Sequence, residues 1–339
     1  MLQDSAPRHR NESMRAVFIS WAPHNSRSDN IAREFGARSC MVYDERFGSR
    51  PSTIVLKYLS QALETWRVLR KEQAEVAFVM TPPLFAGLAL WVYSWFRPLQ
   101  YVVDVHTAAL LMPRWKRFQW LQRFVCRKAA TTLVTNDHLA ALVQAGGGHT
   151  TIVRDVPVRY PCSDRFADKS AFTVAVICSF NYDEPIEHIL KAAVELPEVR
   201  FLFSGDPTPL AAELRDNLPP NVRLTGFLDA ADYGSLLTHA DAVMSLTTRD
   251  HTMLRGAYEA IYLSTPVIVS DWGLLRQAFD EGAVHVDNSA LSIASGVRRI
   301  QAAPETYRQG AASLRQRKLQ QWSETKAQIE LRLRGGDQR

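Results

Sequence analysis

The sequence lacks the features that would assign it at once to several common classes. Only four of its 339 residues are cysteines, at positions 40, 126, 162 and 178. No two of them have the CxxC spacing of a zinc site and no disulfide framework is implied, which favours a reducing, cytoplasmic setting. The longest apolar stretch, Leu84–Phe96, has 13 residues, fewer than the roughly 20 that cross a bilayer.

Common phosphate-binding signatures are also missing. No GxGxxG follows an expected strand and there is no Walker A motif, which argues against dehydrogenases and P-loop enzymes. Residues 1–13 are polar and have no apolar segment of the kind found in signal peptides. We therefore expect a disordered tail there and a fold that starts at residue 14.

Acidic residues are scarce in the first half of the chain. Residues 1–160 hold 21 Lys and Arg against 12 Asp and Glu, whereas residues 161–339 hold 19 against 23. A basic half favours anions such as phosphates, anionic lipid or nucleic acid. No nucleic-acid-binding motif accompanies the charge, so we expect no nucleic-acid partner.

Short apolar and β-branched runs alternate with helical segments. In the first half the expected strands are Ala16–Ser20, Val76–Met80, Tyr101–Val105, Thr132–Thr135 and Thr151–Val153. In the second half they are Phe172–Ile177, Val199–Ser204, Val222–Thr225, Ala242–Leu246 and Pro266–Ser270. Helical segments, such as Ser52–Lys71 and Pro83–Phe96, lie between them. This alternation predicts an α/β protein with two parallel sheets, each covered by helices on both faces.

The same alternation predicts a domain organisation. Residues 155–171 contain prolines and charges with little periodicity, so we interpret them as a linker. The expected parts are a first Rossmann-like domain over 14–160, a second over 171–303 and a closing helical segment over 304–335. Two such doubly wound domains would face each other across a cleft, with ligands at the carboxyl ends of the strands.

One segment of the second half resembles a known family. Glu259-Ala260 is followed by Pro266-Val267-Ile268-Val269-Ser270-Asp271. This stretch is similar to the donor-binding signature of family-4-type GT-B glycosyltransferases, also called glycosyl transferases group 1. The resemblance implies two Rossmann-like domains, a C-terminal helix that crosses back to the first, and a nucleotide-diphosphate sugar as donor. It also implies that Glu259 accepts hydrogen bonds from the ribose.

The polar loop before Glu259 departs from the family pattern. The family has an acidic residue eight positions before this glutamate, where the present chain has His251, preceded by Asp250. Either Asp250 or His251 is therefore the candidate for the contact with the donor sugar, and Thr252 lies in the same loop. The sequence contains no DxD motif, which the GT-A glycosyltransferases use to hold a metal, so we expect neither a catalytic metal nor a cofactor.

Two further stretches resemble parts of the donor site. Gly226-Phe227-Leu228 matches a loop that lies against the nucleobase in the family, although a simple turn that needs Gly226 for its backbone angles is an equal alternative. Ser179-Phe180-Asn181, followed by Asp183-Glu184, is closer to a loop of the dolichol-linked β-mannosyltransferases. The Arg and Lys that normally neutralise the diphosphate are missing there. Arg249 and Arg255 are our candidates instead, with surface ion pairs as the alternative.

The candidate residues in the first half of the chain are identified by their positions in the sequence. His106 follows the strand Tyr101–Val105, where the resemblance implies a histidine near the reacting carbon, so it is our catalytic candidate. The first strand is followed by His24, Asn25 and Arg27, which we assign to the acceptor together with Arg114.

A basic, aromatic segment follows. Residues 114–128 (RWKRFQWLQRFVCRK) contain six basic residues and no acidic one. Such a segment suits an interfacial helix on an anionic membrane, with a lipid-linked acceptor and a peripheral place on its inner face. An ordinary helix with a core-facing stripe is the other interpretation.

Glycosyl transfer is the function that these patterns favour, in glycan, glycolipid or polysaccharide synthesis. A nucleotide-sugar epimerase on the same architecture and a non-catalytic nucleotide-sugar-binding subunit remain as alternatives. A new glycoside, an epimerised donor or binding alone would distinguish the three.

Overall fold

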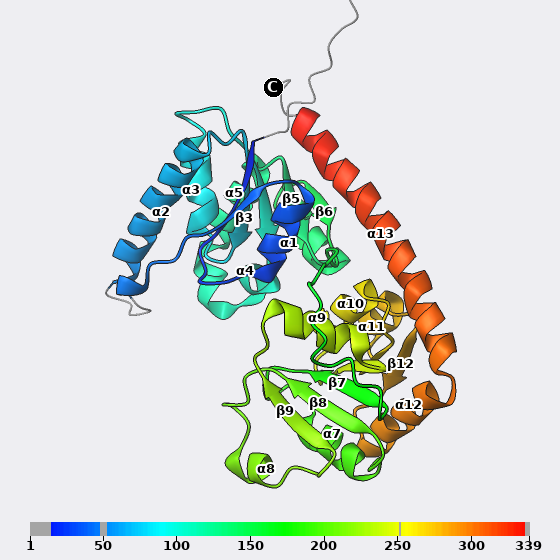
Figure 1. Ribbon diagram of the computed structural model, residues 1–339. Helices are drawn as coiled ribbons and strands as arrows, with labels where there is room; N and C mark the ends of the chain where they lie inside the picture. Colours follow the sequence, from blue (N-terminus) through cyan, green and yellow to red (C-terminus); the bar gives the residue numbers. More distant parts are fainter. Residues whose placement is uncertain (1–14, 48–52, 251, 336–339) are drawn as a thin grey trace, which may run out of the picture. The chain divides into compact units, whose positions relative to one another are not determined.

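The computed structural model describes residues 15–47, 53–250 and 252–335 (Figure 1). The chain forms two compact units. Unit 1 comprises the residues up to Val156 together with those from Trp322 onward, and unit 2 comprises Pro157–Gln321. The tail expected over residues 1–13 and the candidate His251 lie outside the described residues.

Unit 1 is built on a parallel sheet of six strands. These are β1 (Ala16–Ser20), β2 (Arg38–Met41), β3 (Val76–Thr81), β4 (Gln100–Val105), β5 (Thr131–Val134) and β6 (Thr150–Ile152). The spatial order is β2-β1-β3-β4-β5-β6, and every neighbouring pair is parallel.

Helices cover both faces of this sheet. They are α1 (Ser26–Glu34), η1 (Glu45–Phe47), α2 (Ile54–Lys71), α3 (Phe85–Tyr93), α4 (Thr107–Leu111), η2 (Pro113–Phe118), α5 (Gln119–Lys128) and α6 (Asp137–Ala145). Because side chains alternate along a strand, Val17 and Ile19 face the core under α2, α3 and α5, whereas Phe18 faces α1 and α13 on the other side.

Unit 2 repeats the architecture. Its strands are β7 (Thr173–Ile177), β8 (Arg200–Ser204), β9 (Val222–Gly226), β10 (Ala242–Ser245), β11 (Val267–Ser270) and β12 (Ala283–Val286), in the order β12-β11-β10-β7-β8-β9. Its helices are α7 (Ile186–Val194), α8 (Ala212–Asp216), α9 (Ala230–His239), α10 (Arg255–Tyr262), α11 (Gly273–Ala278) and α12 (Ala290–Ala302). The prediction of two parallel Rossmann-like sheets is confirmed.

The long helix α13 (Pro304–Gly335) contributes side chains to both units. Ala311 and Leu314 pack in the core of unit 2. Trp322 and Ile329 pack in the core of unit 1, where the Trp322 indole donates a hydrogen bond to Oε2 of Glu34 at 2.7 Å. Leu314 and Trp322 of the same helix are thus part of different cores.

The structure differs from the sequence prediction over residues 114–128. They form not one helix but the 3₁₀ helix η2 followed by α5. In one continuous helix Trp115 would point about 120° away from Leu121 around the axis. The change of helix type at Phe118 lets Trp115, Leu121 and Val125 all pack into the core. Part of this segment is therefore an ordinary core helix, although Phe118 and Trp120 stay exposed. Within the described part of the chain, every helix is too short or too polar to span a membrane.

Candidate donor and acceptor loops

The loops after β7 and β10 meet at the carboxyl edge of the unit 2 sheet. The strands run from β7 through β8 to β9 on one side and from β10 through β11 to β12 on the other. In doubly wound sheets, ligands bind at the carboxyl edge where the strand order reverses in this way. The two loops are joined there, because the Thr248 amide donates to the Asp183 carbonyl at 2.7 Å and the Arg249 guanidinium lies 3.7 Å from the Asp183 carboxylate.

The carboxylate of Glu184 fixes the conformation of the loop after β7. Both carboxylate oxygens of Glu184 accept the Ser179 amide at 3.0 Å, and one also accepts the Asn181 amide at 3.0 Å. Phe180 adopts a left-handed backbone conformation, with φ of 55°, and stacks on Phe203 in the core. Burial raises the pKa of the Glu184 carboxyl. These backbone amides already donate to a carboxylate, so they are not available to bind a diphosphate.

Hydrogen bonds from side chains at or after the ends of β11 and β12 hold the loop after β10. The Thr247 amide donates to Ser270 Oγ at 2.8 Å, and Ser270 donates to Asn288 Oδ1 at 2.7 Å. The Asn288 amide and the Trp272 indole both donate to the Thr247 carbonyl at 3.0 Å. Sequence reasoning missed Asn288 because it follows β12, which was not predicted. Asn288 lies two residues after the end of β12 and adopts a left-handed backbone conformation, with φ of 69°.

Beyond Thr247 the loop carries most of the candidate residues. Arg249 is half-exposed, and its guanidinium lies over the Tyr182 ring at 4.7 Å. Asp250 is exposed, and Thr252 Oγ1 donates to the Asp250 carbonyl at 3.5 Å. Arg255 begins α10, and its side chain is also half-exposed. The structure therefore brings Arg249, Asp250, Thr252 and Arg255 together in one loop and helix start.

Glu259 occupies a buried polar cluster. Its side chain is 2 % exposed, and its carboxylate accepts the Tyr160 hydroxyl at 2.8 Å, the Tyr233 hydroxyl at 2.7 Å and the Arg255 Nε at 2.6 Å. Burial, followed by the charge of Glu259, raises the pKa of both tyrosines, so their hydroxyls stay protonated and donate. Sequence reasoning found Glu259 and Arg255 but missed both tyrosines, which come from the start of unit 2 and from α9.

The loop after β9 divides its residues between solvent and core. Gly226 has φ of 71°, a conformation that favours glycine. Phe227 is exposed, whereas Leu228 is buried in the core under α9 and α10. Of Phe227 and Leu228, only Phe227 is therefore available to a nucleobase in this structure.

In unit 1 the start of α1 and the end of β4 are joined by a buried ion pair. The Arg27 guanidinium lies 3.0 Å from Asp104 Oδ2 and also donates to the Val153 carbonyl at 3.2 Å. Burial raises the pKa of the Asp104 carboxyl, but Arg27 and His106 outweigh burial and hold this pKa well below its ordinary range. Arg27 thus faces inward and fixes the loop.

His106 lies beside this pair at the start of α4. Its Nε2 is 3.4 Å from Asp104 Oδ2, and its side chain is about one-third exposed. His24 is exposed, while Asn25 caps α1 by accepting the Ser28 amide at 2.9 Å. Arg114 is exposed in η2, with its guanidinium over the Trp115 ring.

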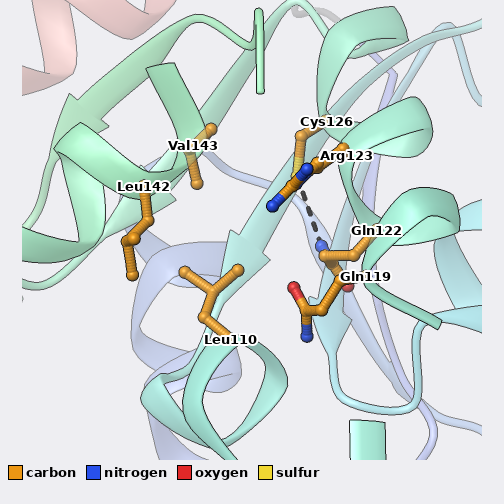
Figure 2. A pocket seen from close by; sticks show the side chains of 7 residues that line it. All are labelled: Leu110, Gln119, Gln122, Arg123, Cys126, Leu142 and Val143. Carbon is orange, nitrogen blue, oxygen red and sulfur yellow. Dashed lines mark hydrogen bonds between the residues drawn. The ribbon is translucent and has the colours of Figure 1, made fainter. Parts of the chain in front are cut away.

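Each of the two units contains a pocket. One pocket of about 130 Å³ lies in unit 1 and is lined by seven residues (Figure 2): Leu110, Gln119, Gln122, Arg123, Cys126, Leu142 and Val143. The Gln122 amide donates to Cys126 Sγ across its wall. Ligand pockets usually measure about 300–1,000 Å³, so this one is too small for a nucleotide sugar. A second pocket, of about 540 Å³, lies in unit 2 and is lined by Lys191, Val194, Glu195, Ala290, Leu291, Ala294 and Arg298. Because ligands of doubly wound sheets bind at the carboxyl ends of the strands, the strand-end loops are the candidate site. Among the described residues, no group of three His, Cys, Asp or Glu side chains is placed to hold a metal ion.

Residues 184–328 match a family model described as glycosyl transferase-like. No curated protein matches the sequence. HepE from Anabaena, solved with UDP and glucose, has a similar structure, with a TM-score of 0.68 and 14% identity over 94% of this chain and 99% of that one. Sucrose-phosphate synthase from Thermosynechococcus elongatus has a TM-score of 0.64 and 16% identity over 94% of this chain and 88% of that one.

A putative UDP-N-acetylglucosamine 2-epimerase from Listeria monocytogenes gives a TM-score of 0.55 and 13% identity over 88% of this chain and 82% of that one. At such identities the likeness shows a shared fold. Because transferases and an epimerase both have it, the fold alone does not separate the two activities.

Proposed function

We propose that this chain, which matches a glycosyl transferase-like family model over residues 184–328 and shares its fold with HepE, is a glycosyltransferase that transfers a sugar from a nucleotide-diphosphate donor bound at the carboxyl edge of unit 2. Unit 1 supplies the acceptor site. The observation that carries this proposal is the meeting of the β7 and β10 loops at the point where the strand order reverses, with two half-exposed guanidinium groups beside it.

The diphosphate is the part of the donor that these cations fit. Arg249 and Arg255 present planar, permanently charged donors that suit phosphate oxygens. Arg255 also stands at the start of α10, where backbone amides favour an anion. Charge that develops on the leaving diphosphate would be stabilised by the same groups.

The remaining donor contacts follow from the same loops. Of the three partners of Glu259, Arg255 is the exposed one. We propose that the diphosphate draws the Arg255 guanidinium towards itself and thereby frees a Glu259 oxygen for the ribose. Phe227 offers an exposed aromatic face to the nucleobase. Asp250 is the described candidate for the contact with the sugar.

The chemical step also needs unit 1. His106 is the candidate there, because its imidazole is partly exposed and is oriented beside the buried Asp104–Arg27 pair. His24, Asn25 and Arg114 are the acceptor candidates. A lipid-linked acceptor, used at the inner face of a membrane, is the class that the basic character of this unit favours.

A product assay with a matched pair of variants tests the proposal. Arg249→Ala should raise the KM for the nucleotide sugar at least tenfold, because it removes a charged hydrogen-bond donor worth about 1.5–3 kcal/mol. Arg298→Ala, on the exposed side of α12, should leave the KM unchanged. An epimerised donor with no glycoside would instead identify an epimerase. Equal KM values in both variants would remove Arg249 from the donor site.

A further inference from the structure

Helix α2 exposes several apolar side chains while it buries several polar ones. Val55, Leu56, Leu59 and Leu63 are between 53 and 64 % exposed. The side of the same helix that faces the core carries Lys57, Gln61 and Thr65, which are at most 6 % exposed, beside apolar side chains such as Leu69 and Trp66. Burying a leucine side chain stabilises a fold by about 1.5–3 kcal/mol, so a helix free to rotate would turn its leucines inward.

Specific contacts fix the helix in this orientation. The Gln61 amide donates to the Val42 carbonyl at 2.8 Å, and the Trp21 indole donates to Thr65 Oγ1 at 2.9 Å. The Lys57 ammonium lies 4.1 Å from the centre of the Tyr43 ring. These contacts hold the polar side chains of α2 against the rest of unit 1. The leucines on the other side of the helix therefore face solvent.

The outward leucines belong to a larger exposed face. Figure 1 shows α2, α3 and α5 close together in unit 1, and α2 packs against α3. Rings connect these helices, because Tyr58 of α2 contacts Phe85 of α3, which contacts Phe118 of η2. We define the α2–α3–α5 face by its exposed apolar side chains: Val55, Leu56, Leu59, Leu63, Trp95, Phe96, Phe118 and Trp120.

The charge around this face has a single sign at its α3 and α5 sides. Between residues 76 and 136 the only acidic residue is Asp104, which is buried. The same stretch has seven basic residues, all exposed: Arg97, Arg114, Lys116, Arg117, Arg123, Arg127 and Lys128. Exposed leucine and tryptophan side chains flanked by basic residues are the composition of surfaces that enter an anionic bilayer.

A second copy of the chain fits this face less well. A symmetric dimer would place the same patch on both sides, so these seven cations would approach a surface that carries the same seven cations and, on α2, the single exposed acidic residue Glu64. An anionic bilayer supplies the opposite charge and an apolar layer for the leucines. We propose that the α2–α3–α5 face docks unit 1 on an anionic membrane, with the leucines of α2 inserted at the boundary between headgroups and acyl chains.

The position of α2 connects this docking to the acceptor. A crossover helix begins at the carboxyl edge of its sheet, and the exposed Leu56 and Leu59 lie in the first half of α2. Tyr58 contacts Trp21, which opens the loop after β1. The inserted part of α2 therefore adjoins the acceptor candidates. A membrane-borne acceptor follows from this arrangement, and that consequence, unlike the docking itself, rests on the proposed function.

Vesicle flotation with two triple variants tests the docking. The first carries Leu56→Gln, Leu59→Gln and Leu63→Gln, which leave the net charge and the core unchanged. The second carries Val194→Gln, Leu291→Gln and Leu331→Gln, at equally exposed apolar positions elsewhere. Vesicles of phosphatidylcholine with 30% phosphatidylglycerol, in about 0.1 M salt, should bind the wild type and the second variant alike. The first variant should bind at least tenfold more weakly, with an unchanged circular dichroism spectrum.

Equal binding by both triple variants, or no binding of the wild type, would overturn the proposal. A concentration-dependent dimer that the first variant abolishes, without vesicle binding, would identify a second copy as the occupant and would also overturn it. Stabilisation by nucleotide sugars is measured in solution on the same proteins. If it is absent while vesicle binding follows the expected pattern, the proposed function fails and the docking stands.

Discussion

Glu259 shows how one side chain joins the stability of unit 2 to its proposed donor site. Its buried carboxylate holds two tyrosine hydroxyls and the Arg255 guanidinium. A sequence pattern identifies the glutamate but not its partners, because Tyr160 is 99 positions away along the chain and Tyr233 is 26 away. The same residue therefore affects folding and, in our proposal, donor binding.

Glu259→Ala should lower the free energy of unfolding by about 3–5 kcal/mol, because it leaves a charged partner and two buried hydroxyls without their acceptor. Glu259→Gln keeps an acceptor oxygen and should cost less. Denaturant unfolding of the two variants measures the difference. Wild-type stability of Glu259→Ala would show that the carboxylate does not hold this cluster.

Asp104 makes a pH-dependent contribution in unit 1. Its pKa is lower in the folded than in the unfolded chain, where it is about 3.9, because Arg27 and His106 outweigh its burial. The stability that Asp104 contributes is therefore present above about pH 4 and is lost as the pH falls through the lower, folded value.

Asp104→Asn should accordingly lower the free energy of unfolding by about 3 kcal/mol at pH 7, because Arg27 loses its buried counter-charge. The variant should also lose less stability than the wild type between about pH 5 and pH 2. Thermal unfolding across this range measures both. If the stability of the wild type and that of the variant fell equally as the pH decreased, Asp104 would not be responsible for this pH dependence.

At the scale of elements, the sequence predicted the buried strands well. Ala16–Ser20 was predicted with its observed bounds, and nine other strands were found within one or two residues. The two strands that were missed, β2 and β12, lie at the edges of their sheets. The sequence of β2, RSCM, is half-exposed and has no apolar run, so periodicity gave no signal there.

Helix orientation was less accessible to sequence reasoning. The apolar residues of α2 predict a helix over Ser52–Lys71, but they do not reveal that the leucines face outward. That orientation depends on the long-range contacts of Gln61 and Thr65 with Val42 and Trp21. The split between η2 and α5 likewise depends on where Trp115 packs.

The helix α13 allows a test at the same scale. Trp322→Ala should lower the free energy of unfolding of unit 1 by about 3–5 kcal/mol, because the indole packs against Phe35 and bonds Glu34. Leu331→Ala, at an exposed position of the same helix, is the control. Hydrogen exchange resolves the two units. A Trp322→Ala variant with wild-type protection in unit 1 would contradict this assignment of α13.

At the scale of the whole molecule, two parallel six-stranded sheets with different strand orders carry different chemical groups at their carboxyl edges. Unit 2 presents Arg249, Asp250 and Arg255 beside its strand-order reversal, whereas unit 1 presents His106 beside a buried ion pair. The architecture was predictable from local patterns. The polar network of Thr247, Ser270 and Asn288 was not, because it forms only once three strands lie side by side.

Thermal unfolding of the wild type with a panel of nucleotide sugars at about 1 mM tests the central claim most directly. A donor that binds only the folded protein stabilises it by about 2.7 kcal/mol at a concentration one hundred times its Kd. We predict that at least one nucleotide-diphosphate sugar raises the Tm of the wild type and raises that of Arg249→Ala by less. Unchanged melting temperatures across the panel would contradict the assignment of unit 2 as the donor-binding unit.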